Sequence, residues 1–263
     1  MTDWWQALGL AVLQGVTEFL PVSSSAHLIL PAQILGWPDQ GLMVDVSVHA
    51  GTLLAVIYYF RATMWHFVVN LVPGSGPDRT ELWNLCIATA PVVVAGVLLK
   101  EVIATEAREV LVIACATIIF GLLLGWADHQ SRRRSEQRVL ITPRDAFFIG
   151  LAQMFALIPG TSRSGVTITA ALFLGYPAAV ATRFSFLLSI PVITGASIVM
   201  LLSAPAADVT VTGSIVLPAV IASAIFAYAT ISLFMAWVER AGLMPFVIYR
   251  LILGMVLLAW AFR

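Results

Sequence analysis

The chain interrupts one apolar run at Leu20-Pro21-Val22-Ser23-Ser24-Ser25 and another at Ile158-Pro159-Gly160-Thr161-Ser162-Arg163. Proline removes a backbone donor and disfavours helix in the residue before it, so a helix should break at each segment. The apolar runs beside these breaks are roughly 12–17 residues, or about 18–26 Å of helix, which is too short for a ~30 Å bilayer core. Each segment therefore predicts a re-entrant hairpin, which enters the membrane, turns and leaves on the side from which it came.

The composition places the rest of the chain in a membrane. Of the 263 residues, 60% are hydrophobic and 11% are charged. A soluble domain carries about 25% charged residues, so this chain lacks the polar surface to face water on all sides. Six apolar runs close to the length that spans a bilayer predict spanning helices: Val44–Phe60, Leu82–Leu99, Val110–Trp126, Phe184–Leu202, Ile215–Val238 and Leu243–Phe262. The expected fold is an all-α polytopic membrane protein with about six spanning helices, and its zero net charge gives no indication of a nucleic-acid partner.

The distribution of basic residues predicts the orientation. One polar stretch and the loops on its side of the membrane hold most of them: Arg132, Arg133, Arg134, Arg138, Arg61, Arg79, Arg144 and Arg240. The other side keeps Lys100, Arg108 and Arg263. By the positive-inside rule the arginine-rich loop is cytoplasmic, and both termini are then extracytoplasmic. Arg183, near the start of an apolar run, is expected to extend its charge toward the membrane edge.

The two proline segments also indicate a duplication. Leu35-Gly36-Trp37-Pro38 is echoed by Leu174-Gly175-Tyr176-Pro177 at nearly the same offset that separates the two proline segments. We expect a first repeat over 1–127, with a hairpin at 4–36 and three spanning helices, then a basic loop over 128–143. The second repeat then covers 144–263, with a hairpin at 144–175 and three spanning helices. Because an odd number of spans separates the hairpins, they enter from opposite sides, which makes an inverted-topology repeat with a binding site near the midplane.

The first hairpin carries an acid, hydroxyls and an imidazole. Gln14 and Glu18 are four residues apart and share one helix face, and Ser24 and His27 share another just beyond the break. Ser23 can cap the second half-helix. An acid that merely reaches an interface is the alternative for Glu18, but ionisable groups inside an apolar hairpin are costly and indicate function.

The second hairpin supplies the opposite charge. Arg163 offers a planar fork for phosphate oxygens, and the following helix start provides backbone N–H donors for an anion. The other predicted site residues are hydroxyls and a glycine that surround these charges: Ser25, Thr161, Ser162, Ser164 and Gly165. Close packing through small residues is the alternative, but it leaves the central arginine unexplained. Two half-helix N-termini that face each other suit a diphosphate.

Three segments resemble one known family. Gln14 to Glu18, Pro21 to His27 and Pro159 to Gly165 are similar to the undecaprenyl-pyrophosphate phosphatase family, also called bacitracin-resistance proteins. The likeness extends to Val44–Thr52 and Phe246–Arg250.

The resemblance implies an enzyme that hydrolyses undecaprenyl pyrophosphate to undecaprenyl phosphate and phosphate at the periplasmic side of a bacterial inner membrane. This reaction recycles the lipid carrier for cell-wall synthesis and confers bacitracin resistance. The resemblance places Glu18, Ser24, His27 and Arg163 at the catalytic positions. Gln14 stands where many relatives have glutamate, so a role for that position as a required base is in doubt here.

Several roles stay open at this point. The nucleophile is Ser24 or a water, with His27 or Glu18 as the base. The family's behaviour leaves a divalent cation, Mg²⁺ or Ca²⁺, as an option, with Glu18 and Asp45 as candidate ligands, although the sequence shows no complete set of oxygen ligands. Asp45 and His49 are structural groups or supports for the site, and we expect Arg250 to partner a buried acid or carbonyl ahead of a lipid phosphate. The assembly, including a homodimer, is left open.

Two other functions compete with the phosphatase. A lipid-phosphate flippase or anion transporter would suit an inverted repeat, although a carrier needs no nucleophile or base. An intramembrane serine protease lacks its Gly-x-Ser-x-Gly segment here and would leave Arg163 without a task.

Overall fold

The protein is helical throughout the described residues of its computed structural model, which are 4–37, 41–70, 79–99, 109–134, 138–202 and 213–262. The elements are α1 (Trp4–Thr17), α2 (Ser24–Leu35), α3 (Leu42–Tyr59), α4 (Arg61–Asn70), α5 (Arg79–Leu98), α7 (Val110–Arg132), α8 (Pro143–Gln153), the 3-10 turn η1 (Met154–Leu157), α9 (Arg163–Phe173), α10 (Ala178–Leu202), α11 (Gly213–Ala241) and α12 (Met244–Ala261). The predicted all-α fold is confirmed. The outer-side residues Lys100, Arg108 and Arg263 lie outside the described part of the chain.

Six of these helices are long and apolar enough to cross a membrane, and they lie at the six predicted positions. They are Leu42–Tyr59, Arg79–Leu98, Val110–Arg132, Ala178–Leu202, Ile215–Ala241 and Met244–Ala261. The expectation of a multi-pass membrane protein is confirmed in length and composition. The sequence patterns did not predict α4, a short helix that follows the first spanning helix.

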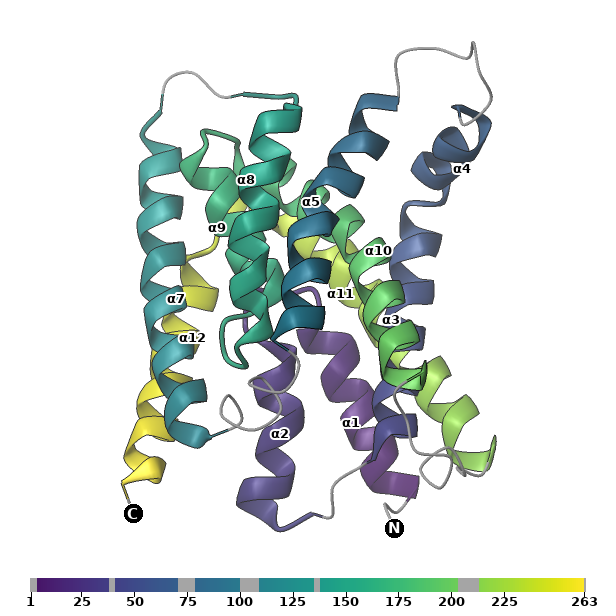
Figure 1. The fold of residues 1–263 in the computed structure, drawn as a ribbon. Helices are drawn as coiled ribbons and strands as arrows, with labels where there is room; N and C mark the ends of the chain where they lie inside the picture. The colour runs from purple at the N-terminus through teal and green to yellow at the C-terminus, as the bar shows by residue number, and fades with distance from the viewer. Residues whose placement is uncertain are drawn as a thin grey trace.

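The two proline segments form two hairpins that approach each other from opposite ends of the molecule. In Figure 1, α1 and α2 rise from the bottom while α8 and α9 descend from the top, and their turns meet near the middle. Both ends of the chain lie at the bottom, opposite the end of α7 and the start of α8 (Figure 1). The structure thus has the expected inverted arrangement, while the repeat boundaries at 127 and 143 stay a prediction.

Glycine brings the first helix of each hairpin against a spanning helix. A Cβ added at Gly15 of α1 would lie 2.7 Å from the Ser223 carbonyl oxygen of α11. A Cβ at Gly150 of α8 would lie 2.6 Å from the Ala88 carbonyl oxygen of α5. Backbones can approach this closely only without side chains between them, and such contacts drive helix association in lipid. These two crossings fix each hairpin in depth.

A polar cluster around Asp145 closes the end of the second hairpin that lies farthest from its turn. Its carboxylate accepts hydrogen bonds from the hydroxyls of Tyr176 (2.6 Å) and Thr142 (2.8 Å) and pairs with Arg138 at 2.7 Å. Burial alone would raise the pKa of Asp145, but these hydrogen bonds and the arginine charge hold it below its usual value. The cluster ties the end of α9 to the start of α8.

Candidate active site

Hydrogen bonds join the turns of the two hairpins directly. The Gly160 N–H donates to Ser23 Oγ at 3.1 Å, and the Ser164 hydroxyl donates to the Leu20 carbonyl at 2.9 Å. Both α2 and α9 begin at this junction, so their N-termini lie where the hairpins meet, as predicted (Figure 1). The helix N-terminus favours anions because its N–H groups are unpaired and its dipole is positive.

The backbone is strained at matching places in the two turns. Ser23 has φ 74° and Ser162 has φ 71°, and they are the non-glycine residues with positive φ in the described part of the chain. Each such residue costs of order 1–3 kcal/mol and persists only where its surroundings hold it. Gly160, at φ 94°, takes the same sign of φ without a Cβ penalty.

The expectation that Ser23 caps the second half-helix is wrong. Ser23 occupies the N-cap position of α2 but its side chain makes no cap hydrogen bond. The positive φ turns its hydroxyl toward the other hairpin, where Gly160 donates to it. Ser162 does cap its own helix, since its Oγ accepts from the Gly165 N–H at 3.1 Å.

Arg250 of α12 links the two turns through hydrogen bonds to their backbone carbonyl groups. Its guanidinium donates to the carbonyl oxygens of Thr117 (3.2 Å), Pro21 (3.2 Å), Gly160 (2.9 Å) and Thr161 (2.9 Å). Because the side chain is fully buried, the four carbonyl dipoles stabilise its charge in place of water. Arg250 was expected to partner a buried acid or carbonyl, and the structure gives it carbonyl partners. Its N–H donors therefore point at backbone oxygens of the protein.

Small residues make room for that arginine. A Cβ at Gly165 would lie 2.8 Å from Arg250 Nη1, and one at Gly121 would lie 3.1 Å from Arg250 Cβ. Gly165 was predicted to lie close to substrate. In the structure it is pressed against the arginine side chain.

Glu18 lies at the centre of the junction and binds three polar side chains. Its Oε1 accepts from Arg163 Nη2 at 2.7 Å. Its Oε2 accepts from Ser24 Oγ at 2.6 Å and from Gln14 Nε2 at 2.9 Å. The Glu18 and Arg163 side chains are 7% and 12% exposed, so this pair is only weakly screened by solvent. A carboxylate, a hydroxyl and a guanidinium predicted to converge are therefore in direct contact.

His27 is held away from this group. Its Nδ1 lies 2.7 Å from the Ser23 carbonyl oxygen, and its Nε2 lies 2.6 Å from the hydroxyl of Tyr249 on α12. Tyr249 was not predicted as a site residue, although it lies beside Arg250. The hydroxyl of Ser24 instead meets Glu18, so the geometry favours Glu18 as the group that takes its proton.

The remaining predicted hydroxyls line the same junction. Ser25 is exposed and its Oγ lies 3.3 Å from Ser23 Oγ. The Ser162 and Ser164 hydroxyls lie 3.2 Å apart. Thr161 is fully buried, and its Oγ1 has no hydrogen-bond partner among the described residues. A buried hydroxyl in this state is a donor available to a water or a phosphate oxygen.

Asp45 and His49 of α3 were predicted to be structural groups or supports for the site. His49 is half-buried, and its Nδ1 lies 2.7 Å from the Asp45 carbonyl oxygen one turn earlier. His49 is also close enough to Glu18 for their charges to interact. The structure thus places His49 near the site without giving it a bond to Ser24 or Arg163.

The residues at the junction do not form a protein-only metal site. In the described parts of the chain, no three His, Cys, Asp or Glu side chains lie together. Divalent cations such as Mg²⁺ and Ca²⁺ need several oxygen ligands. Glu18 would supply one carboxylate, and both of its oxygens already accept hydrogen bonds.

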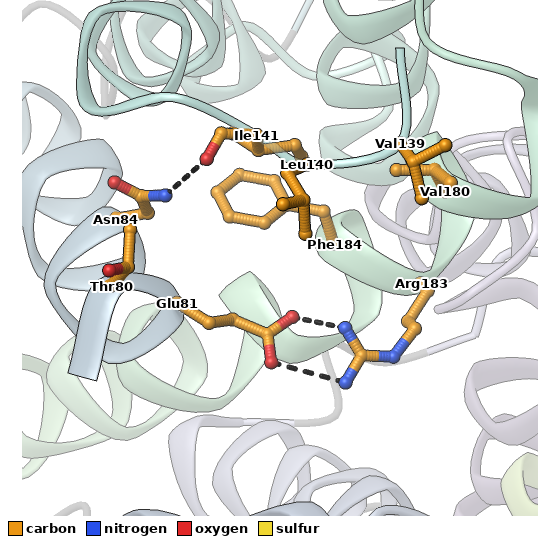
Figure 2. A pocket seen from close by; sticks show the side chains of 9 residues that line it. All are labelled: Thr80, Glu81, Asn84, Val139, Leu140, Ile141, Val180, Arg183 and Phe184. Carbon is orange, nitrogen blue, oxygen red and sulfur yellow. Dashed lines mark hydrogen bonds and ion pairs between the residues drawn. The ribbon is translucent and has the colours of Figure 1, made fainter. Parts of the chain in front are cut away.

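A separate cavity of about 610 Å³ lies at the end of the molecule that carries the arginine-rich loop. Figure 2 shows Glu81 of α5 and Arg183 of α10 joined by two hydrogen bonds in its wall. Arg183 was expected to extend its charge toward the membrane edge. Its side chain is 41% exposed and pairs with Glu81, so the extension toward the edge stays a prediction. The cavity contains none of the predicted site residues.

Comparisons with known proteins identify the family to which the chain belongs. The family model of the bacitracin resistance protein BacA matches residues 7–256. The chain is 52% identical to an undecaprenyl-diphosphatase of Alcanivorax borkumensis, over 98% of this chain and 99% of that one. It is 49% identical to an undecaprenyl-diphosphatase of Chromohalobacter salexigens over 98% and 99%, and 50% identical to one of Alteromonas mediterranea over 96% and 97%.

Proposed function

The chain belongs to the bacitracin resistance protein BacA family, and on that premise we propose that it is an undecaprenyl-diphosphate phosphatase. The integral membrane enzyme converts undecaprenyl pyrophosphate to undecaprenyl phosphate and inorganic phosphate. It thereby recycles the lipid carrier for cell-wall synthesis and confers resistance to bacitracin, as the names of its family and relatives suggest.

One observation carries the proposal: Glu18 binds Ser24 and Arg163 at once, at the junction of two helix N-termini. Phosphoryl transfer requires mainly positioning and compensation of negative charge. Arg163 and the start of α9 supply positive potential for a diphosphate, which competes with Glu18 for the guanidinium. As the pair opens, the carboxylate is freed to accept a proton.

The reaction follows from these contacts. Ser24 Oγ attacks the terminal phosphorus while Glu18 Oε2 takes the hydroxyl proton. The bond from that phosphorus to the bridging oxygen breaks, and undecaprenyl phosphate leaves with the bridging oxygen. Water then attacks the phosphoserine, and the bond from phosphorus to Ser24 Oγ breaks. Glu18 returns its proton to Oγ, and the proton of the attacking water leaves with the inorganic phosphate. Arg163 stabilises the charge on the equatorial oxygens in both steps.

A water activated by Glu18 is the rival nucleophile. Acid quenching during turnover, followed by peptide mass spectrometry, should detect a phosphate on Ser24. If no phosphopeptide forms and Ser24→Ala still turns over substrate, water is the nucleophile and Ser24 only positions Glu18.

A divalent cation enters this proposal only together with the substrate. Mg²⁺ is commonly held by one or two carboxylates plus substrate phosphates. Glu18 could serve as that carboxylate once the diphosphate has taken Arg163. A chelator should then lower phosphate release, and adding back Mg²⁺ or Ca²⁺ should restore it.

We place the enzyme in a bacterial inner membrane with the site open to the periplasm. The positions of the arginines and of both chain ends support this orientation. Cysteines at Leu35, at the far end of α2, and at Leu140, in the arginine-rich loop, would test it in a chain whose two native cysteines are replaced. A membrane-impermeant maleimide should label the first in intact cells and the second only after lysis.

The activity itself is tested by phosphate release from a long-chain isoprenyl diphosphate in detergent. Release by the purified protein supports the enzyme, whereas binding without turnover supports a flippase or carrier. The contacts within one chain do not test whether the protein forms a homodimer. Crosslinking at a range of protein concentrations would test this.

A further inference from the structure

The tautomer of His27 is fixed by its neighbours. Nδ1 lies 2.7 Å from the Ser23 carbonyl oxygen, which can only accept a hydrogen bond. Nδ1 therefore carries a proton, and Nε2 is the atom at which a neutral ring gains a proton and a charged ring loses one.

That atom faces Tyr249. The Tyr249 hydroxyl lies 2.6 Å from Nε2, and the two rings stack at 5.7 Å with an interplanar angle of 12°. His27 is 8% exposed, whereas Tyr249 is 43% exposed. The phenol is therefore the link between a buried imidazole nitrogen and the outside of the protein.

The position of Tyr249 is set by the residue beside it. Arg250 binds carbonyl groups of both hairpin turns, so α12 is fixed to the junction at this height. The next side chain along the same helix then reaches His27 at a defined distance. Adjacent residues of α12 thus hold the backbone of the site and one of its predicted catalytic side chains.

We propose that Tyr249 is a positioning residue for His27. Its hydroxyl donates to Nε2 when the imidazole is neutral and accepts from Nε2 when it is charged. It thereby fixes the ring plane and keeps the proton position defined while the diphosphate is bound and released. The kinetic part of this inference rests on the proposed phosphatase activity, whereas the hydrogen bond itself does not.

The test combines ¹⁵N-histidine spectra with kinetics. The chain has four histidines, so the His27 signals are assigned by their loss in His27→Gln. In the wild type, Nδ1 should be protonated and Nε2 should show the shift of a hydrogen-bonded nitrogen. In Tyr249→Phe, the Nε2 signal should move toward that of a free acceptor nitrogen.

The same variant should lower kcat by about 10- to 100-fold, the effect expected for one lost hydrogen bond to an ionisable group, with KM changed less than about twofold. The pH profile of kcat should also change. Tyr228→Phe is the matched control, because Tyr228 is 39% exposed and packs against Tyr58 and Tyr59. It should leave the spectra and the kinetics unchanged.

A wild-type His27 with a protonated, freely exposed Nε2 would overturn the inference without any variant. So would a Tyr249→Phe enzyme with unaltered His27 signals and pH profile. If the wild type releases no phosphate, the proposed activity fails, but the nitrogen shifts still decide whether Tyr249 holds His27.

Discussion

The two hairpins have similar turns but very different surroundings. In the second hairpin, α9 packs against α7, α8 and α10, and most of its side chains from Ser164 to Leu172 are buried. In the first hairpin, α2 packs mainly against α1, and Ser25 and Leu35 are exposed. The second hairpin, which carries Arg163, is packed on several sides. The first hairpin, which carries Ser24, has an exposed face.

The ends of the two hairpins that lie farthest from the turns also differ in how firmly they are closed. Asp145, Tyr176 and Arg138 close the second hairpin with hydrogen bonds and an ion pair. The first is closed by the contact of Trp5 with Trp37, whose rings lie 5.2 Å apart. The end of the first hairpin therefore has fewer polar constraints than the end of the second.

The largest effect should come from the second hairpin. Arg163→Ala removes the positive charge and leaves Glu18 buried without its partner, so phosphate release should fall by about 10³-fold or more. The matched control is Arg183→Ala, which removes an arginine from α10 at a pair that is much more exposed. An equal loss of phosphate release in the two variants would show that any lost arginine in this part of the protein has the effect, and that the contact of Arg163 with Glu18 is not its cause.

Arg250→Met should have the next largest effect, and on stability. It removes three hydrogen bonds to the two turns and one to α7, and buried carbonyl oxygens lose this donor. The free energy of unfolding in detergent should fall by about 3–5 kcal/mol. A loss below about 1 kcal/mol would mean that the hairpins hold each other without α12.

Side-chain truncations compare the two hairpins directly. Ile168 of α9 lies in the main apolar core, whereas Leu28 of α2 belongs to none of the apolar clusters among the described residues. Ile168→Ala should cost about 2–3 kcal/mol and Leu28→Ala about 1 kcal/mol, because a loosely packed helix relaxes around the lost atoms. Thermal unfolding of both variants measures this, and a reversed order would contradict the distinction between a closely packed and a loosely packed hairpin.

The smallest effect concerns the polar end of the second hairpin. Because the pKa of folded Asp145 is lowered, its contribution to stability is present above its unfolded pKa and is lost as the pH falls through the folded value. Asp145→Asn should therefore be about 1 kcal/mol less stable than wild type at pH 7, with a smaller difference in acid. A difference that persists unchanged at low pH would assign the stability to packing.

The sequence by itself determined the features that depend on neighbouring residues. Apolar run length gave the six spanning helices, and Pro21 and Pro159 gave the two breaks, because helix formation and its interruption are local. The acid and the arginine could be assigned to one site because buried charges in lipid need partners.

Only the tertiary structure decided which atoms meet. Glu18 and Arg163 are 145 residues apart, and His27 and Tyr249 are 222 apart, so no local pattern ranks one partner above another. Ser23 has a positive φ and its Oγ accepts from Gly160, 137 residues away, so a long-range contact took the place of its predicted role as a cap. Residue types set which interactions were required, and packing of the spanning helices chose among the partners that could satisfy them.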